Sequence, residues 1–480
     1  MRSGGGTGRG EAARHGLAIT AAALTLLPTP ALAHGAERGF VMLLPTGHVM
    51  LAGALAVAAS LAVVALVPAR TTERLAAARL ALPAFPRLLP SLVVTSTLSF
   101  IVLLLVLAAG LFGYPDPLRN PLSLTVWTLF WVVLPIAHAL LGNLWRWLNP
   151  FSGPCALLDR ASGGGFTAAR RPLPARLGYL PAIATFLGFA WFELVYPAPD
   201  HPETLGVVVG VYVIMTFAFC LTYGPDVWLR RGDPFGALFG WLAGLSPYAR
   251  SDAGAALVVP GAQLLGRAAL PLSGVLLLLL TLSTVSFDGT MKTFWWLGLT
   301  GVNPLEFPGR TAVMLPNTLG LIAAFAALAG VFFAAISLGR RLAGGGPPVR
   351  VLAGRAVFSI VPIAVTFHLA HYLTALLING QYAALALNDP FGRGWNLFAL
   401  RDWYVTTSFL GSYAGSRAIF AVQTAVIVIG HVLGVLVCHL IVAREEPDPL
   451  KAFLIELPLG VVMVGYTVFG LWLLSTPVAG

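Results

Sequence analysis

Two histidines lie three residues apart in an otherwise apolar stretch, FHLAHYL, at residues 367–373. Residues three apart on a helix share a face, so His368 and His371 are expected to point into the same space. Neutral imidazoles bind Zn²⁺ and copper ions, and a metal with an open position activates water or polarises a phosphoryl oxygen. Ionisable side chains in apolar segments are costly and usually functional. The pair is therefore the first candidate for a chemical site.

Other ionisable residues are expected at a similar depth. Asp288 ends the apolar stretch TLSTVSF, and His431 lies within VIGHVLGV. A carboxylate and further imidazoles complete the ligand types that divalent zinc or copper accepts. We therefore predict a metal site made of His368, His371, Asp288 and His431, with the alternative that these histidines only hydrogen-bond neighbouring helices. Further polar candidates for the same region are His34, His48, Glu193, Asn379 and Gln381.

The composition indicates what must position these residues. Hydrophobic residues make up 58% of the 480 residues and charged residues 10%, against roughly 25% charged in soluble domains. Apolar runs of about 20 residues, each long enough to cross a bilayer core of about 30 Å, recur along the chain. The fold class predicted is all-α: a polytopic transmembrane helical bundle in a single domain, residues 34–480. The three cysteines include no CxxC pair, which favours neither a disulfide framework nor a thiolate metal site.

The first 33 residues resemble a secretory signal peptide. Three arginines precede the apolar segment LAITAAALTLLPTPALA, which ends in the small-residue pattern Ala31-Leu32-Ala33. Cleavage after Ala33 would leave His34 at the mature N-terminus, on the extracytoplasmic side. An N-terminal histidine offers its amine and its ring to one copper ion.

About ten spans are expected after the signal peptide. Their ranges are 47–67, 89–112, 122–142, 178–196, 204–223, 268–287, 314–338, 356–378, 418–441 and 455–476. The segments between them, near 143–177, 224–267 and 379–417, are too short for separate domains and are expected to lie at the interface. The last of these, with Trp395, is either an aromatic anchor or a lid over the polar region.

The charge of the loops predicts the orientation. With the mature N-terminus outside, 19 basic residues fall on the inner side and seven on the outer side. This bias agrees with the positive-inside rule, and it places both mature ends outside a bacterial inner membrane. Because the net charge of +10 is spread over short loops, it indicates topology rather than a nucleic-acid partner.

The chain also resembles a known family. NLWRWLNPF, TVSFDGT, FHLAHYL, NDPFGRGWNLF, GHVLGV and VMVGYTVFGLWLLSTP occur in this order. The series is similar to bacterial integral membrane proteins labelled fenitrothion hydrolase. The resemblance implies hydrolysis of the P–O aryl bond of organophosphate triesters, and it supplies no catalytic residues.

Three functional hypotheses follow from these observations. The first is a metal-dependent phosphotriesterase whose site opens to the outer side and takes a small apolar substrate from the lipid. The second is a metal-handling or transport protein, with copper as its cargo and the histidines as a relay. The third is a bis-histidine haem site between His431 and either His368 or His371, which we rank last. Protein partners are not predicted.

Overall fold

The computed structural model describes residues 44–67, 69–83, 91–251, 254–307 and 309–478. The predicted signal peptide, its cleavage site and His34 lie outside these residues. The described part is an all-α bundle with one small sheet. This confirms the predicted fold class.

Nine helical segments of the described residues are long and apolar enough to cross a membrane. They are α3 (Thr46–Leu66), α5 (Leu92–Phe112), the joined α6, η1 and α7 (Pro121–Leu124, Thr125–Val133, Leu134–Leu141), α12 (Pro202–Tyr223), α15 (Leu272–Met291), α17 (Met314–Leu342) with η6 (Arg310–Val313), α19 (Ile360–Asn388) with α18 (Val349–Ala356) and η7 (Val357–Ser359), α20 (Tyr413–Glu445) and α21 (Pro449–Ser475). Each falls on a predicted span. The membrane-spanning character of the chain is therefore confirmed.

The one predicted span that is not among these nine segments, 178–196, is the shorter helix α11 (Leu180–Leu194). Its 15 residues would extend only about 22 Å as a helix. At its start, the Tyr179 amide donates to Ser273 at the beginning of α15; at its end, the Glu193 and Tyr196 carbonyls accept from Arg310 on the other side of the bundle. The segment thus runs alongside α15 from one side to the other, with non-helical backbone at its ends.

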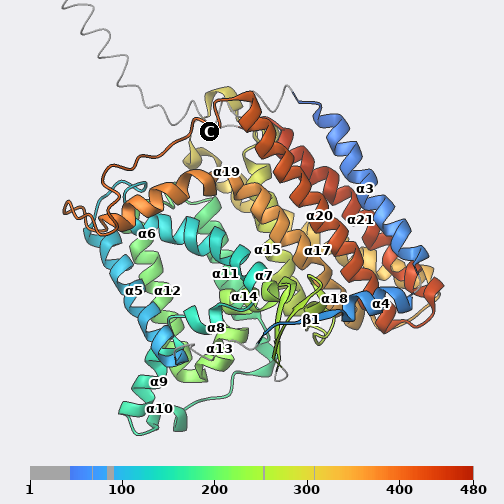
Figure 1. Cartoon of the computed structure of the whole chain (residues 1–480), viewed down its shortest axis with the longest axis horizontal. Helices are drawn as coiled ribbons and strands as arrows, with labels where there is room; N and C mark the ends of the chain where they lie inside the picture. Colours follow the sequence, from blue (N-terminus) through green and yellow to red (C-terminus); the bar gives the residue numbers. More distant parts are fainter. Residues whose placement is uncertain (1–43, 68, 84–90, 252–253, 308, 479–480) are drawn as a thin grey trace, which may run out of the picture.

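The two ends of the described chain lie on one side of the bundle. Leu44, just before α3, packs with Leu471 and Leu474 of α21, and Val478 forms a bridge with Thr293. Figure 1 shows the start of α3 and the C-terminal end at the same edge. Ends on one side require an even number of crossings, which agrees with ten.

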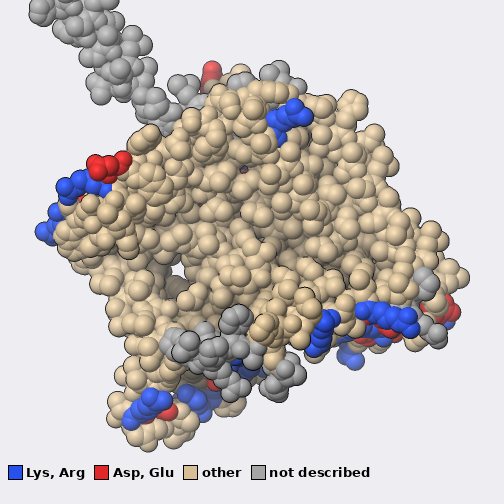
Figure 2. All heavy atoms as spheres, in the orientation of Figure 1, with Lys and Arg blue, Asp and Glu red and all other residues tan. Residues whose placement is uncertain are grey.

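Charged side chains lie mainly at two edges of the molecule. Figure 2 shows Lys and Arg gathered along these edges, with a broad band of uncharged residues between them. We name the side where α7, α12 and α20 end the basic face, because most loop arginines lie there, and the other side the opposite face. Large apolar side chains such as Leu98, Val211 and Ile429 are exposed between the two faces, as lipid-facing residues are.

The small sheet lies next to the basic face. Its strands are β1 (Arg79–Ala81), β2 (Tyr248–Ser251) and β3 (Gly254–Val258), in the order β1-β3-β2, and both pairs are antiparallel. The register places Leu257 opposite both Leu80 and Tyr248. The sheet joins the segment after α4 (Ala69–Ala77) to the loop before α15.

One predicted interfacial segment, 224–267, does not lie only at the surface. Its helices α13 (Pro225–Arg231) and α14 (Pro234–Leu242) form a hairpin that enters the bundle from the basic face. At the tip, Asp233 accepts a hydrogen bond of 2.7 Å from Tyr212, in the middle of α12. Phe235 packs against Phe130, in the middle of the third span, with ring centroids 4.8 Å apart. The prediction of a wholly interfacial segment was wrong because aromatic packing and the buried Asp233 contact hold the hairpin inside.

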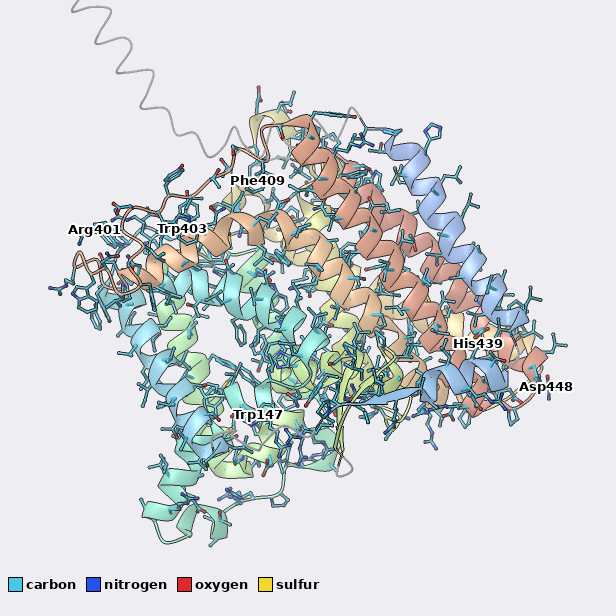
Figure 3. All side chains as sticks on the ribbon, viewed as in Figure 1. Trp147, Arg401, Trp403, Phe409, His439 and Asp448 are labelled. Atoms are coloured by element: carbon cyan, nitrogen blue, oxygen red, sulfur yellow. The ribbon has the colours of Figure 1, made fainter. Side chains whose placement is uncertain are left out.

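The segment after the histidine helix also differs from its prediction. α19 continues to Asn388, ten residues beyond the expected end at 378. The following loop is held by Asn388, whose side chain accepts from the Phe398 amide and donates to Asn396. Figure 3 shows Arg401, Trp403 and Phe409 of this loop along the opposite face, beside α19. Trp395 is 46% exposed.

Candidate active site

A buried carboxylate, Asp288, is the centre of the candidate site. It lies near the C-terminal end of α15 and is 3% exposed. Its Oδ2 is 2.7 Å from Nε2 of His371, and its Oδ1 is 2.7 Å from Nζ of Lys292, one turn further along the chain. The ammonium and the imidazole stabilise the charge of a carboxylate that burial alone would disfavour.

Tyr372 joins this carboxylate to a second one. Its hydroxyl lies 2.9 Å from Oε1 of Glu193 on α11 and 3.1 Å from Oδ2 of Asp288. The indole of Trp131 donates to the same hydroxyl oxygen at 3.4 Å. A tyrosine hydroxyl has one proton, so it donates to only one carboxyl group at a time. The contact with the other is a hydrogen bond only when that group carries a proton of its own.

The two carboxyl groups therefore have different environments. Oδ1 of Asp288 and Oε2 of Glu193 are both buried without a hydrogen-bond partner among the described residues, but Oδ1 forms an ion pair with Lys292, whereas Glu193 forms no ion pair there. A buried oxygen without a donor is costly. Glu193 is thus the group of this pair that can gain and lose a proton, while Asp288 stays ionised between Lys292 and His371.

These groups face a cavity of about 350 Å³ that opens at the opposite face. This volume falls within the range of small-ligand sites, roughly 300–1,000 Å³. Trp127, Val132 and Leu376 form part of its apolar wall. The polar lining consists of Ser123, Thr128, Glu193, Asp200, Asp288, Lys292, Arg310, Tyr372 and Asn379.

Arg310 and Lys292 supply positive charge to the cavity. One Arg310 nitrogen donates to the carbonyls of Glu193 and Tyr196, at 2.9 and 3.2 Å. In the described part of the chain, no carboxylate lies within ion-pair distance of Arg310. The Lys292 side chain is 42% exposed although its partner is buried. Both cations can therefore approach a ligand that develops negative charge.

The four predicted metal ligands do not converge. Nε2 of His368 lies 2.8 Å from the carbonyl oxygen of Trp131 in η1. Pro135, four residues after Trp131, has no N–H for an α-helical hydrogen bond to that carbonyl, and the His368 ring contacts the carbonyl from another helix. His431 contacts the Ile427 carbonyl of its own helix at 2.8 Å. Within the described ranges, no three His, Cys, Asp or Glu side chains form a group that could hold a metal ion.

Of the additional predicted residues that the structure describes, two line the cavity and two do not. Glu193 and Asn379 line the cavity. Gln381 instead holds the outer loop, because its amide accepts from the Thr406 amide at 3.0 Å and donates to the Thr406 carbonyl at 3.1 Å. His48 is exposed at the start of α3, away from the cavity lining.

Four residues of the site were missed from the sequence: Lys292, Arg310, Tyr372 and Trp131. Two signals were present, since Lys292 follows Asp288 by four residues and Tyr372 adjoins His371. A helical spacing of four places a lysine beside an aspartate. Arg310 and Trp131 reach the site only through tertiary packing, which no local pattern indicates.

Comparison of the chain with protein-family models, with curated proteins and with solved structures finds no match. The site is therefore interpreted from its own geometry.

Proposed function

We propose that the protein is a membrane-embedded hydrolase of small apolar esters, organophosphate triesters among them, and that the cavity at Asp288 is its active site. The observation that carries the proposal is the Glu193–Tyr372–Asp288 cluster, which lines a ligand-sized cavity that also contains two cations. The motif series similar to fenitrothion hydrolases supplies the reaction, cleavage of a P–O aryl bond.

The chemistry assigns a role to each side chain. Glu193 takes a proton from a water molecule in the cavity, and the water oxygen forms a bond to phosphorus as the P–O aryl bond breaks. The aryl oxygen leaves as a phenolate with the bonding electrons. Lys292 and Arg310 stabilise the negative charge that develops on the phosphoryl and leaving oxygens. His371 and Tyr372 are positioning residues that hold Asp288 and Glu193.

The location follows from the charge asymmetry of the loops. We place the basic face in the cytoplasm of a bacterial inner membrane, so that the cavity opens to the extracytoplasmic side. An apolar triester dissolves in the adjacent leaflet and reaches the cavity through its apolar wall of Trp127, Val132 and Leu376.

The test is turnover of a nitrophenyl phosphotriester by protein purified in lipid nanodiscs, followed by the absorbance of nitrophenolate. Glu193→Gln keeps the shape of the side chain but removes its ability to take a proton. We expect turnover to fall by about 10²- to 10⁴-fold, the usual contribution of general acid–base catalysis. The matched control is Glu203→Gln, an exposed position in the first turn of α12. Equal turnover in the two variants would rule out Glu193 as the base.

A further inference from the structure

Two free thiols meet on the basic-face side of the bundle, and neither lines the cavity. Cys155 lies on α9 (Ser152–Ala161), a helix between two spans, and Cys220 lies near the end of α12. The two thiols are hydrogen-bonded to each other. Cys155 is 2% exposed and Cys220 0%. Because they are 65 positions apart in the sequence, no local pattern indicates the pair.

The contact belongs to a packed interface between α9 and α12. Phe151, the residue before α9, and Cys155 are four residues apart, which places them on one face of the helix. Val213 and Cys220 of α12 lie in the same buried cluster. The Phe151 ring makes an edge-to-face contact with the Tyr212 ring of α12, with centroids 6.1 Å apart. Figure 1 shows α9 below α5 and α12, at the lower edge of the molecule.

The start of α9 is also fixed to α5. The Ser96 hydroxyl donates to the Asn149 carbonyl at 2.6 Å and accepts from the Gly153 amide at 2.7 Å. A Cβ at Gly153 would lie 2.6 Å from the backbone nitrogen and the hydroxyl of Thr97, so the close approach requires glycine. Cys155 follows two residues later. Because packing holds both helices, the two sulfurs are positioned before they react.

A cation lies beside the pair. The segment after α9 returns to the end of α12, where the Arg171 amide donates to the Thr222 carbonyl at 2.8 Å. The charge of the preceding residue, Arg170, acts on the Cys155 thiol. The hydrogen bond from Cys220 lowers the pKa of the Cys155 thiol, burial opposes this shift, and Arg170 adds to it, so the pKa lies below its ordinary value. A thiolate is the reactive form of cysteine, which makes Cys155 the nucleophile of the pair.

Cys438 shows what an unpaired thiol looks like in the same protein. It is buried on α20, and its thiol contacts the Ser359 hydroxyl instead of another sulfur. It therefore provides an internal control for any reaction that needs two thiols.

We propose that Cys155 and Cys220 form a reversible disulfide in response to hydrogen peroxide. The Cys155 thiolate attacks one oxygen of the peroxide and the O–O bond breaks, which leaves a sulfenic acid on Cys155 and a hydroxide that takes up the released proton. The Cys220 sulfur then attacks the Cys155 sulfur, so that the S–S bond forms, the S–O bond breaks and the hydroxyl leaves as water with the Cys220 proton. The two sulfurs supply the two electrons that reduce the peroxide, and an external dithiol reverses the reaction.

The position of the pair suits a redox-responsive link. α9 is a surface helix, since Leu157 and Leu158 in its next turn are 44% and 39% exposed, and hydrogen peroxide is little larger than water. With the basic face in the cytoplasm, as proposed above, a disulfide there belongs to the transient, redox-sensing kind. The link would hold α9 against α12 and stabilise the folded chain. This site does not depend on the hydrolase activity.

The experiment treats the full chain in lipid nanodiscs with hydrogen peroxide, removes the peroxide with catalase and denatures the protein in N-ethylmaleimide. Peptide mass spectrometry then distinguishes linked from alkylated cysteines. We expect a Cys155–Cys220 linked peptide that forms at least about tenfold faster than Cys438 is oxidised. Dithiothreitol should convert it back to two free thiols. Oxidised wild-type protein should also melt at a higher temperature than reduced protein.

Two substitutions complete the test. Cys155→Ser should abolish the linked peptide, leave Cys220 to be alkylated and remove the effect of peroxide on melting. Cys438→Ser is the matched control and should form the link at the wild-type rate. Wild-type protein in which Cys155 and Cys220 both remain alkylated after peroxide treatment overturns the proposal, even if a variant folds poorly. Oxidation of Cys155 that stops at the sulfenic or sulfinic acid also overturns it, because the two sulfurs would then be unable to join.

Discussion

His368 and His371 lie one helical turn apart, yet they have different partners. His371 contacts Asp288 in the site, while His368 donates to the Trp131 carbonyl, since a carbonyl oxygen only accepts. The sequence predicted a buried, functional polar pair on this helix. It could not separate the two roles, because the Trp131 carbonyl that His368 contacts lies more than 200 residues away in the sequence.

The two histidines should therefore respond differently to replacement. We expect His371→Ala to lower triester turnover by at least about 100-fold, because Asp288 and the Tyr372 hydroxyl beside it lose the imidazole that positions them. We expect His368→Ala to lower the free energy of unfolding by about 1–3 kcal/mol, the cost of a buried carbonyl without its donor. Turnover per folded molecule should stay within a few-fold of wild type in that variant. Thermal melting and nitrophenolate release check the two outcomes, and the opposite pattern would contradict the assignment.

Removal of metal tests the prediction that Asp288 and the three histidines at 368, 371 and 431 bind one metal ion. Nε2 of His371 is engaged with Asp288, Nε2 of His368 with a carbonyl, and His431 lies deeper in the bundle. Treatment of the purified protein with a strong chelator is therefore expected to leave turnover within about twofold. Loss of activity that one added divalent metal restores would contradict this result. It would require the four side chains to converge in the working protein.

At the scale of elements, the positions of the spans were predictable and their irregularities were not. Apolar length located α3, α5, α12, α20 and the others because a bilayer core sets a minimum length. The π-helical turn η1, the short α11 and the inward hairpin α13–α14 depend on partners distant in sequence. Their carbonyl and carboxylate contacts are tertiary, so no periodicity within each segment indicates them.

The contact between α19 and α20 places the histidine helix against the rest of the core. It depends on Gly430, where a Cβ would overlap the side chain of Thr366. We expect Gly430→Ala to force the helices apart and to lower the melting temperature, at a cost of about 1–3 kcal/mol for overpacking. Gly465→Ala on α21 is the matched control, because no atom lies within 4 Å of a Cβ built there. An unchanged melting temperature in both variants would show that α20 is not held by this close approach.

At the scale of the whole molecule, the cavity has a direction relative to the membrane. An even number of crossings places both ends of the described chain on one face, and the asymmetry of basic residues predicts which face is cytoplasmic. The same asymmetry predicts that the cavity opens to the extracytoplasmic side. Hydrolysis would then release its phenolate on the extracytoplasmic side of the membrane.

Labelling of introduced cysteines tests this orientation. The native residues Cys155, Cys220 and Cys438 are free and buried, so wild-type protein should not react with a membrane-impermeant maleimide. Ser408 is exposed in the loop on the opposite face, and Ser162 is exposed in the loop after α9 (Ser152–Ala161) on the basic face. We expect Ser408→Cys to react in intact cells and Ser162→Cys to react only after the membrane is permeabilised. The reverse pattern would place the basic face outside, and the cavity would then open to the cytoplasm.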